Sequence, residues 1–272
     1  EYVGEYPVLK TIYTVPNVGD VDRPADLGSP STPSQDTDAF AKVGKVGLGD
    51  VDILSDYNTL FTVNLYTGNL VRVDNILSDN PSSTEIPVVG APTCKDGKFR
   101  PFGLKVWQGK VLMGGVCTGE NGGKAEDLSA TIMQYDLATG TWSQALNFDL
   151  HQPFYNHGDV VGSVNFNLAQ CREWEPWADI YTERNQVANT GMGEPGSKFD
   201  GNFEIIGGGP TGAEFRCRAQ AIVSDIEVTR DGVMAIALMD RTGHQFGYRQ
   251  LRPTTAAGNP ISASAGGDLV AA

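Results

Sequence analysis

The sequence predicts an all-β protein made of β-propeller-like blades, either incomplete or part of a longer chain. The clearest evidence is residues 47–73, which show three short strands separated by polar turns. Residues 101–142 and 223–238 repeat the pattern of strand, polar turn and apolar strand. Such self-similarity favours radially repeated blades. An irregular β-sandwich is the alternative that the pattern leaves open.

The strands of the first unit follow from hydrophobic alternation. Val51 and Ile53 alternate with Asp50 and Asp52, which is the period-2 pattern of a half-buried strand. Residues 55–58 are short polar residues that favour a turn, and the apolar residues of 60–65 predict a buried strand. A second turn leads to a third strand at 70–73.

The chain divides into two predicted regions. Residues 1–38 comprise one strand at 8–15 and a flexible loop rich in Pro, Gly and Asp, and residues 39–272 form the propeller-like domain. Its second blade spans about 101–150, with a flexible acidic surface loop at 118–127. Residues 223–250 form the last clear blade, and the tail at 261–270 resembles the start of another. Trp174 and Trp177 are expected to anchor the packing between blades.

Composition excludes some classes of function. The chain has 33 Asp and Glu against 20 Lys and Arg, a net charge of -13, which argues against binding nucleic acid. No segment approaches 18 consecutive apolar residues, so we expect no membrane span.

Four widely spaced cysteines predict two disulfides in an oxidising compartment. Four cysteines allow three connectivities, and we favour Cys94–Cys117 and Cys171–Cys217. Cys94 lies just before the strand near residue 102, and Cys117 ends the strand that returns from it. Four buried free thiols in a cytoplasmic protein are the alternative.

Recurring carboxylates are the candidate metal ligands. Asp50 and Asp52 in the first unit correspond to Asp225 and Glu227 in the last, and the innermost strands of a propeller line its channel. Hard oxygen ligands at that place suit Ca²⁺. The alternative is that these carboxylates accept structural hydrogen bonds from neighbouring blades.

A weaker metal candidate involves the histidines. His151 and His157 could bind a metal together with Asp159, although their spacing is also that of an ordinary loop.

Several ordered phrases resemble a known family. They are residues 45–53, 100–106, 114–117, 223–227, 239–245 and 265–269. They are similar to large bacterial cell-surface proteins in which a propeller-like region sits beside SdrD B-like (Cna B-type) domains. The resemblance covers most of residues 40–272 and implies an extracellular, multi-domain, adhesin-like or matrix protein. It carries over no catalytic residues.

These observations predict a non-enzymatic extracellular surface module for adhesion, matrix or filament assembly. Its expected partners are other protein domains, copies of itself or surface glycans. The alternative is a calcium-dependent, lactonase-like propeller hydrolase with Ca²⁺ held by Asp50, Asp52, Asp225 and Glu227.

Overall fold

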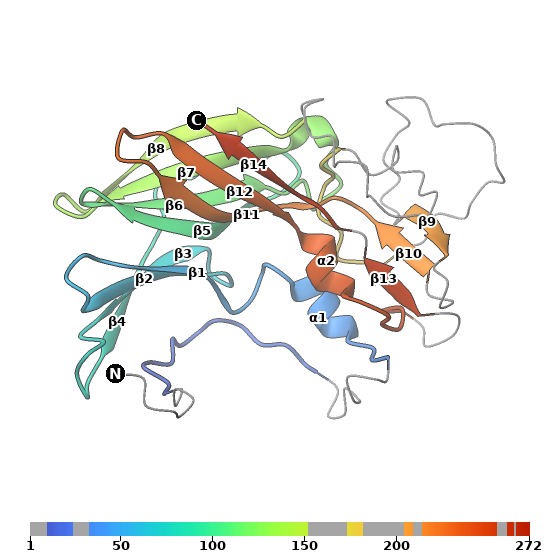
Figure 1. Ribbon diagram of the computed structural model, residues 1–272, viewed down its shortest axis with the longest axis horizontal. Coiled ribbons are helices and arrows are strands. Elements are labelled where there is room, and N and C mark those ends of the chain that lie inside the picture. The colour runs from blue at the N-terminus through green and yellow to red at the C-terminus, as the bar shows by residue number, and fades with distance from the viewer. Residues whose placement is uncertain are drawn as a thin grey trace.

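Antiparallel β-sheets dominate the computed structural model (Figure 1). It describes residues 10–23, 33–151, 173–181, 204–208, 214–254, 260–263 and 265–272. The all-β prediction is therefore confirmed for the described residues. Three of the sheets are antiparallel, and a small fourth sheet contains one parallel pair.

The first sheet is a four-stranded meander in the order β1-β2-β3-β4. Its strands are β1 Leu48–Ile53, β2 Thr59–Asn64, β3 Asn69–Asp74 and β4 Ser82–Ile86. The turns lie where the sequence predicts them. Asp56 forms the β1–β2 turn by accepting hydrogen bonds from the amides of Asn58 and Thr59.

The second sheet repeats this meander in the order β5-β6-β7-β8. Its strands are β5 Phe99–Trp107, β6 Lys110–Cys117, β7 Ser129–Asp136 and β8 Thr141–Asp149. Both of its faces are buried. Along β6, Val111 and Met113 pack toward the first sheet, whereas Leu112 and Val116 pack toward the third. The alternation is the period of two that a strand imposes on its side chains.

The third sheet has three strands in the order β11-β12-β14. They are β11 Ala221–Val228, β12 Met234–Asp240 and β14 Gly267–Ala271. The prediction that 261–270 starts a new blade is wrong, because β14 pairs antiparallel with β12. β14 pairs along the edge of β12, and its Val270 packs against the buried cluster between the second and third sheets.

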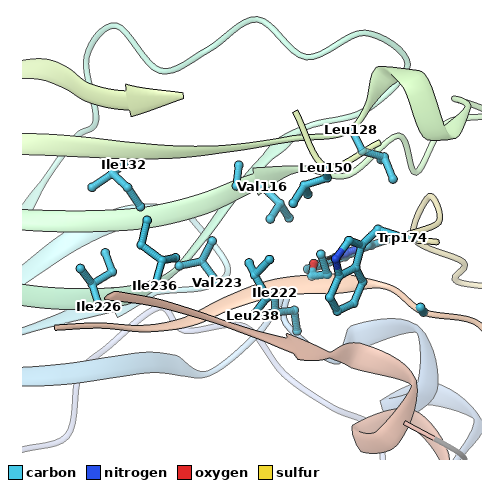
Figure 2. Close-up of a cluster of buried hydrophobic side chains, with 14 of the residues drawn as sticks. Val116, Leu128, Ile132, Leu150, Trp174, Ile222, Val223, Ile226, Ile236 and Leu238 are labelled. Atoms are coloured by element: carbon cyan, nitrogen blue, oxygen red, sulfur yellow. Dashed lines mark hydrogen bonds between the residues drawn. The ribbon is translucent and has the colours of Figure 1, made fainter. Parts of the chain in front are cut away.

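The three sheets stack face to face, with the second in the middle (Figure 1). One buried cluster lies between the first and second sheets and contains Phe61, Val63, Leu70, Leu104 and Met113. The other lies between the second and third. Figure 2 shows its Ile132 and Val116 pointing toward Val223 and Ile236, with Trp174 closing one end. Trp174 and Trp177 are thus buried between sheets, as predicted.

Residues 10–23 cross the outer face of the first sheet. The Tyr13 hydroxyl lies 3.1 Å from that of Ser83, and the Asn64 amide donates to the Asn17 carbonyl at 3.0 Å. Residues 10–15 have no regular secondary structure, so the predicted strand at 8–15 is wrong over its described part. Tyr13 contacts the sheet through Ser83, whereas Ile12 is 53% exposed.

Two short helices, which the sequence reading missed, pack at one end of the stack. They are α1 Thr37–Lys42 and α2 Arg241–Phe246, capped by the side chains of Asp36 and Asp240. Phe40 and Phe246 meet with ring centroids 5.2 Å apart. Beside the helices lies the small sheet, with β9 Glu204–Gly208, β10 Glu214–Cys217 and β13 Ile261–Ala263. A 3₁₀ turn, η1, spans Ala125–Asp127. Within the described residues, no helix is long and apolar enough to cross a membrane.

Candidate functional site

The first strands of the three stacked sheets lie next to one another and are here called the inner strands: β1, β5 and β11. Each carries a β-bulge near its start, at Leu48/Val51, Pro101/Gly103 and Val223/Asp225. A bulge bends the strand and increases its twist locally.

The faces of the sheets define which positions of the inner strands are equivalent. Asp52 pairs with Phe61, Lys105 with Leu112 and Glu227 with Ala235. Asp52 and Lys105 project toward the following sheet in the stack, and Glu227 projects from the corresponding, outer face of the third sheet. Two residues earlier on each inner strand, Asp50, Gly103 and Asp225 occupy a second set of equivalent positions. The recurrence seen in the sequence is therefore a structural equivalence.

The carboxylates of Asp50 and Asp52 join the first sheet to the second. Asp50 Oδ2 accepts a hydrogen bond from the backbone N–H of Leu104 at 2.9 Å, and Asp52 Oδ2 accepts one from Val106 at 2.8 Å. Their Oδ1 atoms accept from the N–H groups of Val51 and Ile53. All four oxygens are thus used. They satisfy edge amides of β5 that have no ladder partner on that side.

A charge ladder crosses the three inner strands. Lys105 Nζ lies 3.5 Å from Asp52 Oδ2 and 3.0 Å from Glu227 Oε1. Partial burial acts to lower the pKa of Lys105, but the hydrogen bond of Glu227 and the charge of Asp52 outweigh it and raise that pKa. The lysine therefore stays charged between its two acidic neighbours.

Asp50 is the member of the acidic set whose pKa is raised. Burial raises its pKa, and the charges of Asp225 and Asp52 add to that effect, although its amide hydrogen bonds oppose it. Gly103 of β5 lies against the backbone of Asp225 and leaves no side chain between the two acidic strands. A Cβ at Gly103 would lie 3.0 Å from the amide nitrogen of Asp225.

The four predicted Ca²⁺ ligands thus lie on two of the inner strands, β1 and β11, with β5 packed against both. Within the described ranges, no group of three or more His, Cys, Asp or Glu side chains is arranged to hold a metal ion. The calcium site stays a prediction. Of the second candidate set, the backbone N–H of His151 donates to Asp149, and His157 and Asp159 lie outside the described residues.

A mostly buried ionic network, which the sequence did not reveal, lies at the helical end of the stack. Glu120 binds Arg100 at 2.7 Å and Lys45 at 3.1 Å. Lys45 also binds Asp179 at 2.6 Å, and Asp179 binds Arg241 at 3.1 Å. The network connects β5, the loop after β6, the segment before β1, residues 173–181 and α2.

Arg241 anchors this network in the interior. Its guanidinium is fully buried, lies 4.6 Å from the centroid of the Trp177 ring and donates to the carbonyls of Val43, Ala178 and Ala41. Burial lowers the pKa of Arg241 to about 10, while Asp179 opposes that shift, so the side chain is charged at neutral pH. Glu120, placed by the sequence in a flexible surface loop, has only 6% of its side chain exposed.

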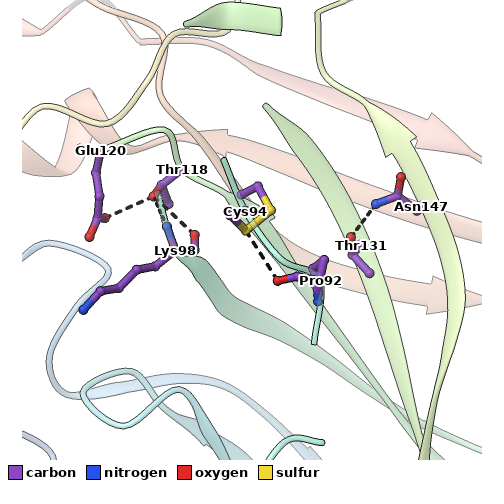
Figure 3. Close-up of a disulfide and its surroundings, with 8 residues drawn as sticks. Pro92, Cys94, Lys98, Thr118, Glu120, Thr131 and Asn147 are labelled. Atoms are coloured by element: carbon purple, nitrogen blue, oxygen red, sulfur yellow. Dashed lines mark hydrogen bonds between the residues drawn. A yellow bond between two sulfur atoms is a disulfide. The ribbon is translucent and has the colours of Figure 1, made fainter. Parts of the chain in front are cut away.

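The predicted disulfide Cys94–Cys117 is confirmed, with Cα atoms 5.3 Å apart. It fixes the segment that precedes β5 to the end of β6 (Figure 3). Thr118, the next residue, donates to Glu120 at 3.1 Å, so the disulfide also positions the ionic network. Cys217 is disulfide-bonded as well, and its predicted partner, Cys171, lies outside the described residues.

An open cavity of about 560 Å³ lies between residues 19–23 and 34–47 on one side and residues 244–253 on the other. Its lining includes Asp36, Lys42 and His244. Asp36 caps α1 and Lys42 pairs with Asp38 at 2.8 Å, so these two charged groups already have partners.

Comparison with known proteins finds partial similarity to colossins of Dictyostelium discoideum. Colossin-C is 29% identical over 142 residues, covering 50% of this chain and 13% of colossin-C. Colossin-A is 27% identical over 181 residues, which is 64% of this chain and 2% of colossin-A. Colossin-D is 36% identical over 81 residues, or 29% of this chain and 8% of colossin-D. The chain therefore spans a small part of the curated relatives it matches. No family model matches the sequence.

Asp50→Ala tests the role of the carboxylates between sheets. The variant leaves the Leu104 amide without an acceptor, so we expect the free energy of unfolding to fall by about 1–3 kcal/mol. Asp50→Asn keeps one acceptor oxygen and relieves the repulsion from Asp225, so its loss should be smaller. Asp79→Ala, at an exposed aspartate of the β3–β4 turn, is the control and should change stability by about 0.5 kcal/mol or less. Urea unfolding measures all three, and equal losses for Asp50→Ala and Asp79→Ala would refute the role.

Glu120 predicts a specific dependence of stability on pH. Burial acts to raise its pKa, but the hydrogen bonds and charges of Arg100 and Lys45 prevail and lower it to about 2. Because the folded-state pKa lies below the unfolded value, this stabilisation is full above about pH 4.5 and is lost as the pH falls toward 2.

Glu120→Gln isolates that contribution. At pH 7 the variant should be less stable than the wild type by about 3 kcal/mol, because the mostly buried Arg100 loses its carboxylate partner and Lys45 keeps only Asp179. The difference should shrink as the pH falls from about 4.5 to 2. Glu126→Gln, at a mostly exposed glutamate, serves as control and should differ little from the wild type at every pH. A wild type–Glu120→Gln difference that does not vary with pH would contradict the assignment.

Proposed function

We propose that this protein is a non-enzymatic, extracellular interaction module built from propeller-like blades, within a larger surface protein of the bacterial adhesin or matrix type. It acts in adhesion, matrix or filament assembly. Its partners are other protein domains, further copies of the chain or surface glycans.

The observation that carries this proposal is the use of the recurring carboxylates. Asp50 and Asp52 direct every oxygen to a backbone amide, and Asp52 also approaches Lys105. In a metal-dependent hydrolase the equivalent oxygens would instead point to a shared ion with an open coordination position. A structural role for these acids therefore fits better than a catalytic one.

The propeller-like arrangement is supported by how the sheets stack. Each sheet begins at the junction of the inner strands, and the first two are four-stranded meanders of the kind that forms a blade. The second sheet buries both faces against its neighbours, as an internal blade does.

The extracellular location is supported by the disulfide Cys94–Cys117, because such bonds persist in oxidising compartments. The partial matches support a module within a longer chain, since the aligned regions make up 13% of colossin-C and 2% of colossin-A.

Surface labelling of intact source cells tests the location. A membrane-impermeant amine reagent should modify Lys95 and Lys124, whose side chains are 68% and 69% exposed. Lys45, 13% exposed, should stay unmodified and thereby report that the protein is folded. Non-reducing peptide mapping should recover Cys94 linked to Cys117. Labelling only after lysis, together with free thiols, would overturn the extracellular proposal.

Calcium titration tests the hydrolase alternative. With all four carboxylate oxygens of Asp50 and Asp52 engaged by backbone amides, we expect calorimetry to show no saturable binding at millimolar Ca²⁺ and no rise in Tm. Stoichiometric binding that is abolished by Asp225→Asn with Glu227→Gln, accompanied by Ca²⁺-dependent lactone hydrolysis, would favour the alternative and reject the proposal. Both substitutions lie on exposed side chains, so they should leave the fold intact.

A further inference from the structure

The outer face of the third sheet has the pattern of a buried stacking face but is exposed to solvent. In the ladder, Leu70 pairs with Val63, Ile132 with Gly114, and Leu269 with Ala237. These pairs place Leu70, Ile132 and Leu269 at matching positions on the third strand of each sheet. Leu70 and Ile132 are 0% exposed because the next sheet covers them, whereas Leu269 is 76% exposed.

β11, the inner strand of this sheet, carries acidic residues equivalent to those that join the first two sheets. Asp225 and Glu227 occupy the positions of Asp50 and Asp52, and both are exposed. Asp225 Oδ1 accepts from the amide of Ile226, just as Asp50 Oδ1 accepts from Val51. At β1 the other oxygen, Oδ2, binds the next inner strand. In the part of the chain that the structure describes, no further inner strand is stacked on β11 to donate a backbone N–H to Asp225 Oδ2.

Small side chains on the face leave room for a partner's larger ones. Ala235 and Ala237 stand where the second sheet has Leu112 and Gly114, and both are partly exposed. An apolar side chain such as Leu269 contributes about 25 cal/mol per Å² of apolar surface when it is covered. The face therefore offers apolar area next to the exposed carboxylates of Asp225 and Glu227, of which Glu227 already pairs with Lys105 through Oε1.

The chemistry of the occupant follows from the junction already present in the molecule. The acidic strand β1 is followed by β5, which has Gly103 where β1 has Asp50 and Lys105 where β1 has Asp52. The amides of Leu104 and Val106 donate to the acidic strand. A strand stacked on the acidic strand β11 should therefore resemble β5, since acidic residues at these positions would repel Asp225 and Glu227.

We propose that the outer face of β11-β12-β14 binds a basic β-strand of a partner polypeptide. This strand carries a small residue and, two positions later, Lys or Arg, and it stacks on β11 as β5 stacks on β1. The inference rests on the proposed interaction function and specifies its surface and partner class.

The test uses the whole chain and a labelled probe. The probe is a backbone-cyclised hairpin of residues 99–117 with Cys117→Ser, whose strand register is verified by NMR, because free hairpins are only marginally stable. Fluorescence polarisation should show saturable binding that weakens as NaCl is raised. Replacing Lys105 by Glu in the probe should weaken binding by about 10- to 100-fold, the loss expected for a charge-assisted hydrogen bond.

Protein variants locate the binding face. Asp225→Asn with Glu227→Gln should weaken probe binding by a similar factor, and Leu269→Asp should abolish it. The matched control is Leu77→Asp in the β3–β4 turn, where the leucine is 77% exposed and binding should be unchanged. Circular dichroism checks that each variant is folded.

Absence of binding, or equal binding by the variants and the wild type, would overturn the inference. So would concentration-dependent dimers in sedimentation velocity that Leu269→Asp abolishes, because the occupant would then be a second copy. A protein that is labelled on intact cells but does not bind the probe would retain the proposed function and lose only this surface.

Discussion

The architecture depends on one constraint, which is that the free edge of each inner strand must find hydrogen-bond partners. A strand at the end of a sheet pairs on one side only, and unpaired buried amides are costly. Stacking three sheets brings three such edges together. The chain resolves this by placing Asp50 and Asp52 on β1, where each carboxylate accepts from its own strand and from β5. The same side chains therefore satisfy the edge and set the register of one sheet against the next.

The helical end of the stack is held by a network of charges that are buried except for the partly exposed Asp179. Arg241 and Lys45 lie 4.6 and 6.0 Å from the centroid of the Trp177 ring and share Asp179, and Glu120 extends the network to Arg100. Buried ion pairs tolerate desolvation only when their remaining donors are satisfied. Arg241 meets that condition through three backbone carbonyls. The network thereby fixes two short helices that would not be stable alone.

Local sequence signals predicted most of the sheets. The alternation around Val51 and the turn residues near Asp56 define β1 and β2, because strand period and turn chemistry act over a few residues. Cys94–Cys117 was predictable because a hairpin brings two specific positions together. By contrast, α2 has only six residues and contains Gly243, so its helical signal is weak. It forms because Asp240 caps it and because Arg241 is held by the tertiary structure.

The candidate site was predicted in part for the same reason. Repetition of acidic residues identified Asp50, Asp52, Asp225 and Glu227 as a set, and they do share one junction. What they bind depends on backbone amides of β5, which no side-chain pattern records. The Glu120 network joins segments separated by more than 100 residues, so no local window contains it.

The charge alternates from one inner strand to the next, so the two ends of the stack differ in what they can bind. The carboxylates of the acidic strand β1 accept hydrogen bonds from its own amides and from those of β5. In contrast, β5, with Gly103 and Lys105, has no carboxylate at these positions. Two acidic strands in succession would place carboxylates side by side, and even across Gly103 the charge of Asp225 contributes to raising the pKa of Asp50. Like charges about 4 Å apart repel by roughly 1 to 4 kcal/mol, depending on solvent exposure. A second copy offering its own β1 to β11 would incur this repulsion at two positions. Residues 13–17 already contact the outer face of the first sheet at Ser83 and Asn64. The stack is thus covered at one end and selective for a basic strand at the other, which favours a defined partner over indefinite addition of identical chains.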